Sequence, residues 1–581
     1  MRQNRCGWKR GQHRLPCIIQ PAKNLCPCCR QWYCHGHWPV HQRAVQLFVE
    51  RGMGLFKDLR DRGVYTGYEK YVVRLEPVLE SMSTRGIPVP RDAWEETKAK
   101  LEERRGEIVK AMQALVPAGC LKHHPSKGYK KEPKGFVEGG VTEHGGEEAV
   151  WGMRWFPVAT EEAVTDGIAK LHPQWRVNFH IRVYEEQRWV KLLPWTPSPA
   201  NLIRYMKHMK HLIPVSFKTQ RNTTNQLELA RLANKTKDLL YHIVLEYREV
   251  STVIDNHIKN WEPGADGRVH PTFYYETGTG QLASRRPNVQ NAPKHKKETA
   301  DLFRGMVRAR PGHCLLEFDY KSFHVHTLAF EAQDEDLLRL ARLDVHSFVT
   351  AHLLHLPGAN ECLAWDDDRL KVYLAGVKKA HKEVRDAKVK HAFLGYDNGM
   401  GWKKLYNQYQ EFFASQGEAK RVMELLDQLF PKSKRYRERI CQVAHEQGYL
   451  LSRFGCIRWF WEVFKWEGGK FVSGGDDHEA ALSFFTQNDA HCYLKDALLR
   501  LNEYGALDRY GFMNTIHDSL MFECPLELRD EAIRTVAEEM ERPNVTLSDP
   551  LIAAGGLSVA VGVSVGDNWS EMKEVDWHGI R

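Results

Sequence analysis

Long apolar stretches are absent from this sequence of 581 residues. No run approaches the ~18 consecutive apolar residues that a membrane-spanning helix needs. The N-terminus also lacks the apolar core of a secretory signal peptide. These absences exclude integral membrane proteins and proteins secreted through a cleaved leader. We therefore expect a protein that contacts no membrane and works in the cytoplasm.

Acidic residues are missing from the first part of the chain, where the earliest one is Glu50. Basic residues precede it, and the whole chain has a formal net charge of +9. A basic balance of this kind indicates a polyanionic partner, although charge alone does not identify one.

Cysteines are sparse beyond the N-terminus: six of the thirteen lie before residue 35 and the others are scattered singly. This distribution fits reduced thiols and one metal module better than a disulfide framework. The N-terminal group contains C-x2-C, four residues and then C-x2-H, a spacing at which thiolates and imidazoles can close a tetrahedral zinc site. We predict a zinc-binding module in residues 1–45 with the ligands Cys26, Cys29, Cys34 and His37. Cys6 and Cys17 could complete this site or a second one, and the alternative is a redox-sensitive tail.

The zinc module can be tested by metal analysis of protein purified without chelator. We expect one or two zinc ions per chain, because closed thiolate shells stabilise small modules that have little apolar core. The double variant Cys26→Ser/Cys29→Ser should lose zinc. Full zinc retention in that variant would remove these two ligands from the site.

Two short segments each carry a carboxylate among apolar residues. Residues 315–320 (LLEFDY) form an apolar run that ends on Asp319, and residues 512–522 hold Asp518 among alternating apolar residues. Both patterns are typical of β-strands. Each Asp alone could merely end a strand or cap a turn. Together on adjacent strands they would hold two hard cations ~4 Å apart, as a two-metal phosphoryl-transfer site requires.

The pattern from residue 68 to residue 258 is mainly helical. Trp94, Leu101, Ile108 and Leu115 recur at heptad spacing, which predicts a helix with one buried stripe. Gly, Pro, Lys and His then interrupt the pattern, and Val177, Phe179, Ile181 and Val183 alternate with polar residues as in a strand. We interpret residues 118–194 as an insertion in the helical region.

Residues 277–293 read TGTGQLASRRPNVQNAP, residues 319–326 read DYKSFHVH, and residues 516–519 read IHDS. In the same order, these segments resemble the TGRLSS…PNLQNIP segment, motif A (DYSQIELR) and motif C (VHDE) of family A (DNA polymerase I-like) DNA polymerases. The resemblance covers residues 68–581 apart from the insertion. Where this sequence diverges from the family pattern, it resembles phage and other viral members more than cellular ones. Shorter matches are residues 198–202 with SPKQL, 344–351 with DIHxxTA and 565–569 with the closing GxNW.

The resemblance implies an α+β protein with the right-hand polymerase fold of palm, fingers and thumb, preceded by the zinc-binding module. The palm would hold an antiparallel sheet with Asp319 and Asp518, and helical fingers would surround Lys390. The expected divisions are residues 46–260 for the thumb with its insertion, 261–332 for the first part of the palm, 333–478 for the fingers and 479–581 for the second part of the palm.

Motif B allows two registers. The segment KHAFLGYDNGMG aligns without a gap with the family's K-x3-[FYL]-G-x2-Y-G-x-G. This register places Lys390, Leu394 and Asn398 four residues apart on one face of a helix. The other register puts Lys388 in the lysine position and Tyr396 in the tyrosine position. We prefer the first, because it keeps the closing Gly-Met-Gly in place.

The resemblance also implies roles for single residues. Asp319 and Asp518, with the carbonyl of Tyr320, would hold two Mg²⁺ ions, and Lys390 would complete the catalytic set by binding phosphates as a compact cation. Arg385 is one residue away from the family's upstream Arg, and Gln281 stands where the family usually has Arg. The nucleotide-binding set would be Tyr320, His324, Arg385, Lys390, Leu394 and Asn398. The DNA-binding set would be Gln281, Asn288, Asn291, Gln487 and His517.

Three positions depart from the family pattern. His324 replaces the motif A Glu and Asn398 replaces the motif B Tyr, the pair that forms the wall against a ribose 2′-hydroxyl. Ser519 replaces the Glu that follows the motif C Asp. Because His-Asp-Ser also occurs in single-subunit phage RNA polymerases, one alternative is RNA synthesis or a sugar-permissive polymerase. An inactive primer–template-binding protein is another.

The expected function is template-directed addition of deoxynucleotides to a primer 3′-hydroxyl by two-metal phosphoryl transfer, in phage or viral DNA replication. Its partners would be primer–template DNA, dNTPs and replisome proteins, and its location the host-cell cytoplasm. We expect no proofreading exonuclease, because few residues precede the helical region and none of those before Glu50 is acidic.

Overall fold

The computed structural model describes residues 57–117, 120, 138–143, 149–153, 175–180, 195–216, 220–275, 277–293 and 297–580. The predicted zinc ligands lie outside these residues, so the zinc-binding module stays a prediction. Within the described ranges, no helix has the length and apolar content to cross a membrane.

The central sheet is antiparallel, with five strands in the order β13-β14-β8-β15-β16. Its strands are rich in apolar, β-branched and aromatic residues, which favour this conformation. One face packs against helices α19 and α21, where Phe318 and Tyr320 are buried. The bounds are β8 His313–Tyr320, β13 Phe512–Ile516, β14 Ser519–Pro525, β15 Val561–Gly566, β16 Lys573–Val575, α19 His478–Glu503 and α21 Arg529–Glu541.

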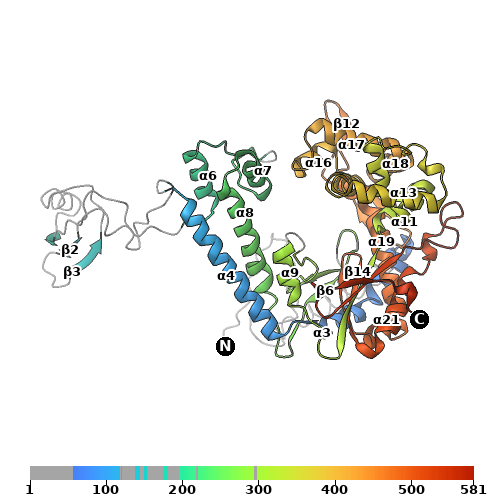
Figure 1. Cartoon of the computed structure of the whole chain (residues 1–581), viewed down its shortest axis with the longest axis horizontal. Coiled ribbons are helices and arrows are strands. Elements are labelled where there is room, and N and C mark those ends of the chain that lie inside the picture. The colour runs from blue at the N-terminus through green and yellow to red at the C-terminus, as the bar shows by residue number, and fades with distance from the viewer. Residues whose placement is uncertain are drawn as a thin grey trace, which may run out of the picture.

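A group of long helices stands to one side of this sheet in Figure 1. The longest is α4, which packs along α8 through buried Trp94, Leu101 and Ile108, as the heptad pattern predicts. The expectation for Leu115 is wrong: it is the last residue of α4 and is 37% exposed, whereas Met112 is buried. The bounds are α4 Arg91–Leu115, α6 Pro199–His208, α7 Gln226–Thr236, α8 Leu239–Thr252 and the π-helical η4 Val253–Ile258.

The segment that precedes α4 packs under the sheet rather than with the long helices. Strand β1 pairs with β5, so that Ile87 lies opposite Val269. The Tyr71 hydroxyl donates a 2.8 Å hydrogen bond to Asp496 of α19. Residues 65–88, which the sequence prediction places with the thumb, therefore contact the central sheet and α19. The bounds are α2 Tyr65–Tyr68, η1 Glu69–Val73, α3 Glu76–Arg85, β1 Ile87–Pro88, β5 Arg268–Val269, β6 Thr272–Tyr274, β7 Ala283–Arg285 and α9 Lys297–Gly305.

Most of the remaining helices form a second group, above the sheet in Figure 1. It begins with α10, which follows β8 directly and packs against α19 and α18. Two small hairpins, β9–β10 and β11–β12, lead from α18 to α19. The bounds are α10 Phe323–Ala332, α11 Glu335–Leu343, α12 Val345–Leu353, α13 Asp367–Ala380, α14 Lys382–Val384, η6 Arg385–Val389, α15 Lys390–Asp397, α16 Trp402–Gln408, α17 Gln416–Leu429, α18 Pro431–Gln447, β9 Tyr449–Leu451, β10 Ile457–Trp459, β11 Phe464–Glu467 and β12 Lys470–Ser473.

The insertion contains an antiparallel three-stranded sheet in the order β3-β2-β4. The bounds are β2 Glu138–Glu143, β3 Ala149–Met153 and β4 Trp175–His180. The predicted strand around Val177 and Phe179 is β4, while Ile181 and Val183 lie outside the described residues.

Candidate active site

Asp319 and Asp518 are brought together by the pairing of β8 with β14. Asp319 is the second-last residue of β8 and lies opposite Ser519, which directly follows Asp518. Asp518 lies in the tight turn between β13 and β14, where His517 has the left-handed φ of 55° that such a turn requires. The Asp319 side chain is exposed and that of Asp518 is 17% exposed. The sheet thus places two accessible carboxylates on adjacent strands, about two hundred residues apart in the chain.

This donor set fits magnesium, which is bound through one or two carboxylates and keeps several waters and substrate phosphates as further ligands. The Tyr320 side chain faces the core and its hydroxyl donates to the Met540 carbonyl at 2.8 Å, so only its backbone carbonyl is left to reach a cation. No group of three or more His, Cys, Asp or Glu side chains in the described ranges has the geometry of a metal site. A cation held by Asp319 and Asp518 would need substrate and water to complete its coordination.

His324 lies in the first turn of α10, beside the two carboxylates. Its Nε2 is 3.5 Å from Asp518 Oδ2, and its ring meets His491 edge-on at 6.3 Å between centroids. The buried Nδ1 of His324 has no hydrogen-bond partner in the described part of the chain. Asp397, at the end of α15, is buried nearby, and burial raises its pKa to about 6 against the opposing effect of His324. Sequence reasoning missed Asp397, since nothing in the motif B pattern marks it.

Helix α15 carries Lys390 and Leu394 and is capped at its end by Asn398, the three residues predicted to share one face. Lys390 is exposed, Leu394 is 51% exposed and Asn398 is half-buried at the end of the helix. Tyr396 is buried, with the Arg437 guanidinium 4.1 Å from its ring centroid. Lys388 is paired with Glu418 at 2.6 Å. Lys390 and Leu394 are thus exposed, whereas Tyr396 is buried and Lys388 is engaged in an ion pair; the register with Lys390 stays a prediction.

The helix that leads into α15 contains a π-turn, η6. In this turn the N–H of Lys390 donates to the carbonyl of Arg385, five residues earlier. Such a turn takes up one residue more than an α-turn. Arg385 and Lys390 therefore lie five residues apart but at the two ends of one helical turn.

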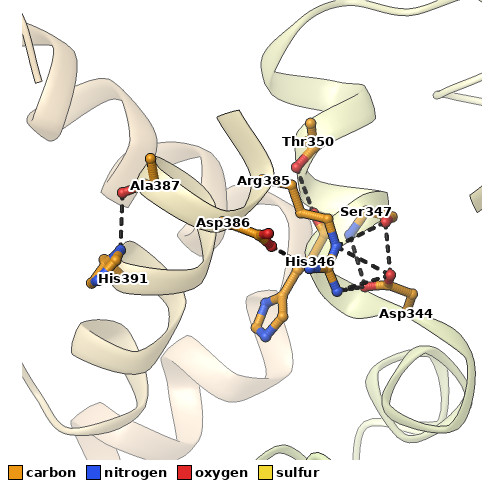
Figure 2. Close-up of polar contacts among 8 residues, drawn as sticks. All are labelled: Asp344, His346, Ser347, Thr350, Arg385, Asp386, Ala387 and His391. Atoms are coloured by element: carbon orange, nitrogen blue, oxygen red, sulfur yellow. Dashed lines mark hydrogen bonds and ion pairs between the residues drawn. The ribbon is translucent and has the colours of Figure 1, made fainter. Parts of the chain in front are cut away.

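Arg385 is held by α12, as Figure 2 shows. Its Nη2 donates to both carboxylate oxygens of Asp344 at 2.9 Å, and its Nε donates to the Ser347 hydroxyl at 3.1 Å. Burial pushes the pKa of Asp344 up, but hydrogen bonds from Arg385 and Ser347 outweigh it and leave this pKa below its usual value. In this conformation the guanidinium of Arg385 is bound to Asp344 and Ser347, so its phosphate-binding role stays a prediction.

We expect the substitution Asp344→Asn to lower the free energy of unfolding by about 2 kcal/mol, because it leaves the largely buried guanidinium of Arg385 with only its ion pair to the more exposed Asp386. The Asn would still cap α12, as Asp344 does through the N–H of Ser347. Asp366→Asn is the matched control, because Asp366 caps α13 in the same way but is exposed. Urea unfolding at pH 7 measures both variants.

The lowered pKa of Asp344 also predicts how the stability of the protein depends on pH. The stabilisation by Asp344 should be complete above about pH 4 and lost as the pH falls below that value, because its pKa is lowered by folding. Equal stability of the two variants would contradict a structural role for the Asp344–Arg385 pair.

The predicted DNA-contacting residues lie on both sides of the carboxylates. Gln281 Nε2 is 3.5 Å from the His517 ring, and Gln487 Nε2 donates to Asn398 Oδ1 at 2.7 Å. The latter bond joins α19 to the end of α15. Asn288 and Asn291 are exposed; the Asn288 side chain also accepts from the Asn291 N–H at 3.2 Å and so shapes its own turn.

Comparisons with known proteins agree with this geometry. Residues 196–571 match the sequence profile of DNA polymerase family A. DNA polymerase I of Caldicellulosiruptor bescii is 26% identical over 387 residues, which are 65% of this chain and 41% of that protein. DNA polymerase I of Geobacillus stearothermophilus is 26% identical over 348 residues, 58% of this chain and 36% of that protein. The chain thus spans well under half the length of these curated relatives.

A solved structure extends the comparison to the fold. The POL domain of Pol1 from M. smegmatis, in complex with DNA primer-template and dNTP, superposes with a TM-score of 0.60 and 18% identity. The match covers 89% of this chain and 73% of that chain. At this identity the likeness concerns the fold alone.

Proposed function

Since this chain belongs to DNA polymerase family A, we propose that it is a template-directed DNA polymerase that adds deoxynucleotides to the 3′-hydroxyl of a primer. The observation that carries the proposal is the pairing of β8 with β14. In this pairing Asp319 lies opposite Ser519, the residue that directly follows Asp518. The exposed face of α15 with Lys390 supports it. Two carboxylates and an exposed lysine are the groups that nucleotidyl transfer from a triphosphate needs.

In the proposed reaction, Asp319 and Asp518 hold two Mg²⁺ ions with the carbonyl of Tyr320. When bound, these ions lower the pKa of the primer hydroxyl and neutralise the leaving pyrophosphate. Lys390 binds the triphosphate as a point charge. Leu394, the exposed apolar residue on the same helix face, packs on the base, and Asn398 is placed beside it by Gln487. These contacts align the α-phosphate with the hydroxyl for in-line attack.

Primer–template DNA and dNTPs are the proposed partners, as in the complex of the M. smegmatis relative. Gln281, Asn288, Asn291, Gln487 and His517 contact the duplex, and dispersed Lys and Arg residues supply most of the affinity through phosphates. Such binding falls steeply as salt rises, because each neutralised phosphate releases counterions. We further propose a role in phage or viral replication, in the cytoplasm of the host and with replisome proteins, and no excision of mismatched nucleotides by this chain.

RNA synthesis, or use of both sugars, is a second candidate, favoured by His324 and Asn398 at the two sugar-facing positions and by Ser519 after Asp518. Primer extension with deoxy- and ribonucleotides side by side distinguishes DNA synthesis from these alternatives. We expect extension with dNTPs and little with rNTPs. Equal or preferred use of rNTPs would support the second candidate, and no extension with either would support an inactive DNA-binding protein.

A further inference from the structure

Glu317 lies on the same face of the sheet as Asp319. In β8, Glu317 pairs with Met521 of β14, and Asp319 pairs with Ser519. Alternate residues of a strand share a face, and so do residues directly opposite each other in an antiparallel pair. Glu317, Asp319 and Ser519 therefore share the face opposite to buried Phe318. Two residues along a strand separate the two acidic side chains by about 6.6 Å.

The Glu317 carboxylate contacts the strand that follows Asp518. Ser519 Oγ lies 3.2 Å from Glu317 Oε1 and 3.0 Å from the Ile516 carbonyl. A hydroxyl has one proton, so it donates to one of these acceptors at a time. The half-buried Glu317 carboxylate thus has unused capacity to accept hydrogen bonds beside the two metal-binding residues.

The negative charge of Glu317 is not paired with a basic side chain in the part of the chain that the structure describes. In the described ranges no Lys, Arg or His forms an ion pair with Glu317, and the single one to Asp518 comes from His324. Glu523 provides the contrast, since it lies farther along the same face, opposite Leu315. It is paired with Arg268 at 2.7 Å and Arg310 at 3.7 Å. Like charges in proximity are unfavourable unless a cation joins them.

We propose that Glu317 is a positioning residue of the cation site, resting on the proposed polymerase function. Its carboxylate accepts hydrogen bonds from water molecules on the bound cation and adds a third negative charge to those of Asp319 and Asp518. Groups that orient ligands of a metal in this way tune its affinity. Glu317 thereby supplies, from the neighbouring strand, the carboxylate that Ser519 lacks.

The test is the binding of Mn²⁺ to the full chain without nucleotide, followed by electron paramagnetic resonance. The isosteric variant Glu317→Gln should weaken Mn²⁺ binding about tenfold and raise the Mg²⁺ concentration for half-maximal primer extension in the same proportion. The matched control is Glu527→Gln, which removes an exposed charge beyond the far end of β14 and should change neither quantity. Unchanged Mn²⁺ affinity in the Glu317→Gln variant would overturn the proposal.

A transposition variant makes the test specific. Adding Ser519→Glu to Glu317→Gln returns a carboxylate to the same face and should restore most of the lost Mn²⁺ affinity. If Glu317→Gln does not fold, Ser519→Ala provides the test. This variant keeps the negative charge of Glu317 but removes the hydroxyl that contacts its carboxylate. It should change the Mg²⁺ concentration for half-maximal primer extension by a smaller factor. No rescue by Ser519→Glu, or no shift with Ser519→Ala, would count against the proposal. If Asp319→Asn and Asp518→Asn also extend primers normally, the polymerase site itself is misplaced, which is a separate failure.

Discussion

Replacing Asp319 or Asp518 with Asn should reduce nucleotide addition by roughly three orders of magnitude or more, because metal-ion stabilisation of the transition state is worth several kcal/mol. Asp319 lies near the end of β8 and Asp518 in the turn directly before β14. Asn is nearly isosteric but carries no charge, so the fold should remain and the cations should be lost. Single-turnover primer extension measures the effect.

Binding of primer–template DNA should remain within a fewfold of wild type in these variants, because affinity comes from dispersed phosphate contacts. Fluorescence anisotropy measures it at fixed salt. Asp368→Asn, an exposed carboxylate of α13, is the charge-matched control and should extend primers normally. Near-normal extension by the Asp319 or Asp518 variant would refute the assignment of the site.

The substitution His324→Ala should raise ribonucleotide insertion by about two orders of magnitude, with a much smaller effect on deoxynucleotides. Rejecting an added hydroxyl needs a rigid steric contact, because an apolar pocket discriminates only ~10²-fold. His324 is placed for such a contact, in the first turn of α10 with Nε2 at 3.5 Å from Asp518. Asn398, the other residue proposed to face the sugar, accepts a hydrogen bond from Gln487.

The measurement is the ratio of kcat/KM for a ribonucleotide to that for the matching deoxynucleotide. The ratio removes any general loss of rate caused by breaking the contact with Asp518. His355→Ala, at the end of the α12 region, is a control and should leave the ratio unchanged. If wild type already uses both sugars equally, or if the His324→Ala variant is as selective as wild type, His324 is not the gate.

The sequence predicted the elements that rest on regular periodicity. The apolar run at residues 315–320 predicted β8, and the heptad predicted the buried residues of α4. The single strand expected over residues 512–522 is wrong, because the structure divides it into β13 and β14 with Asp518 in the turn between them. The pattern failed at Leu115, since the final turn of a helix can lie beyond its partner. It also placed residues 65–88 in the thumb, because local periodicity does not say which surface a segment packs against.

Other features depend on tertiary contacts that the motifs do not encode. The π-turn before Lys390 places Arg385 five residues ahead of it in one helical turn, which a linear motif does not encode. The Arg385–Asp344 pair joins two helices that a linear motif treats separately. Glu317 did carry a usable signal, because its spacing of two from Asp319 puts both residues on one face of a strand. Reading residues 315–320 as a simple apolar run concealed it.

The most direct measurement of the central claim is addition of one nucleotide to a primer by the purified chain, with each template base tested against each of the four dNTPs. The account predicts that only the complementary dNTP is added, that chelation of divalent cations abolishes addition, and that Mg²⁺ restores it. Addition that ignores the template base, or that persists in full after chelation, would contradict the account.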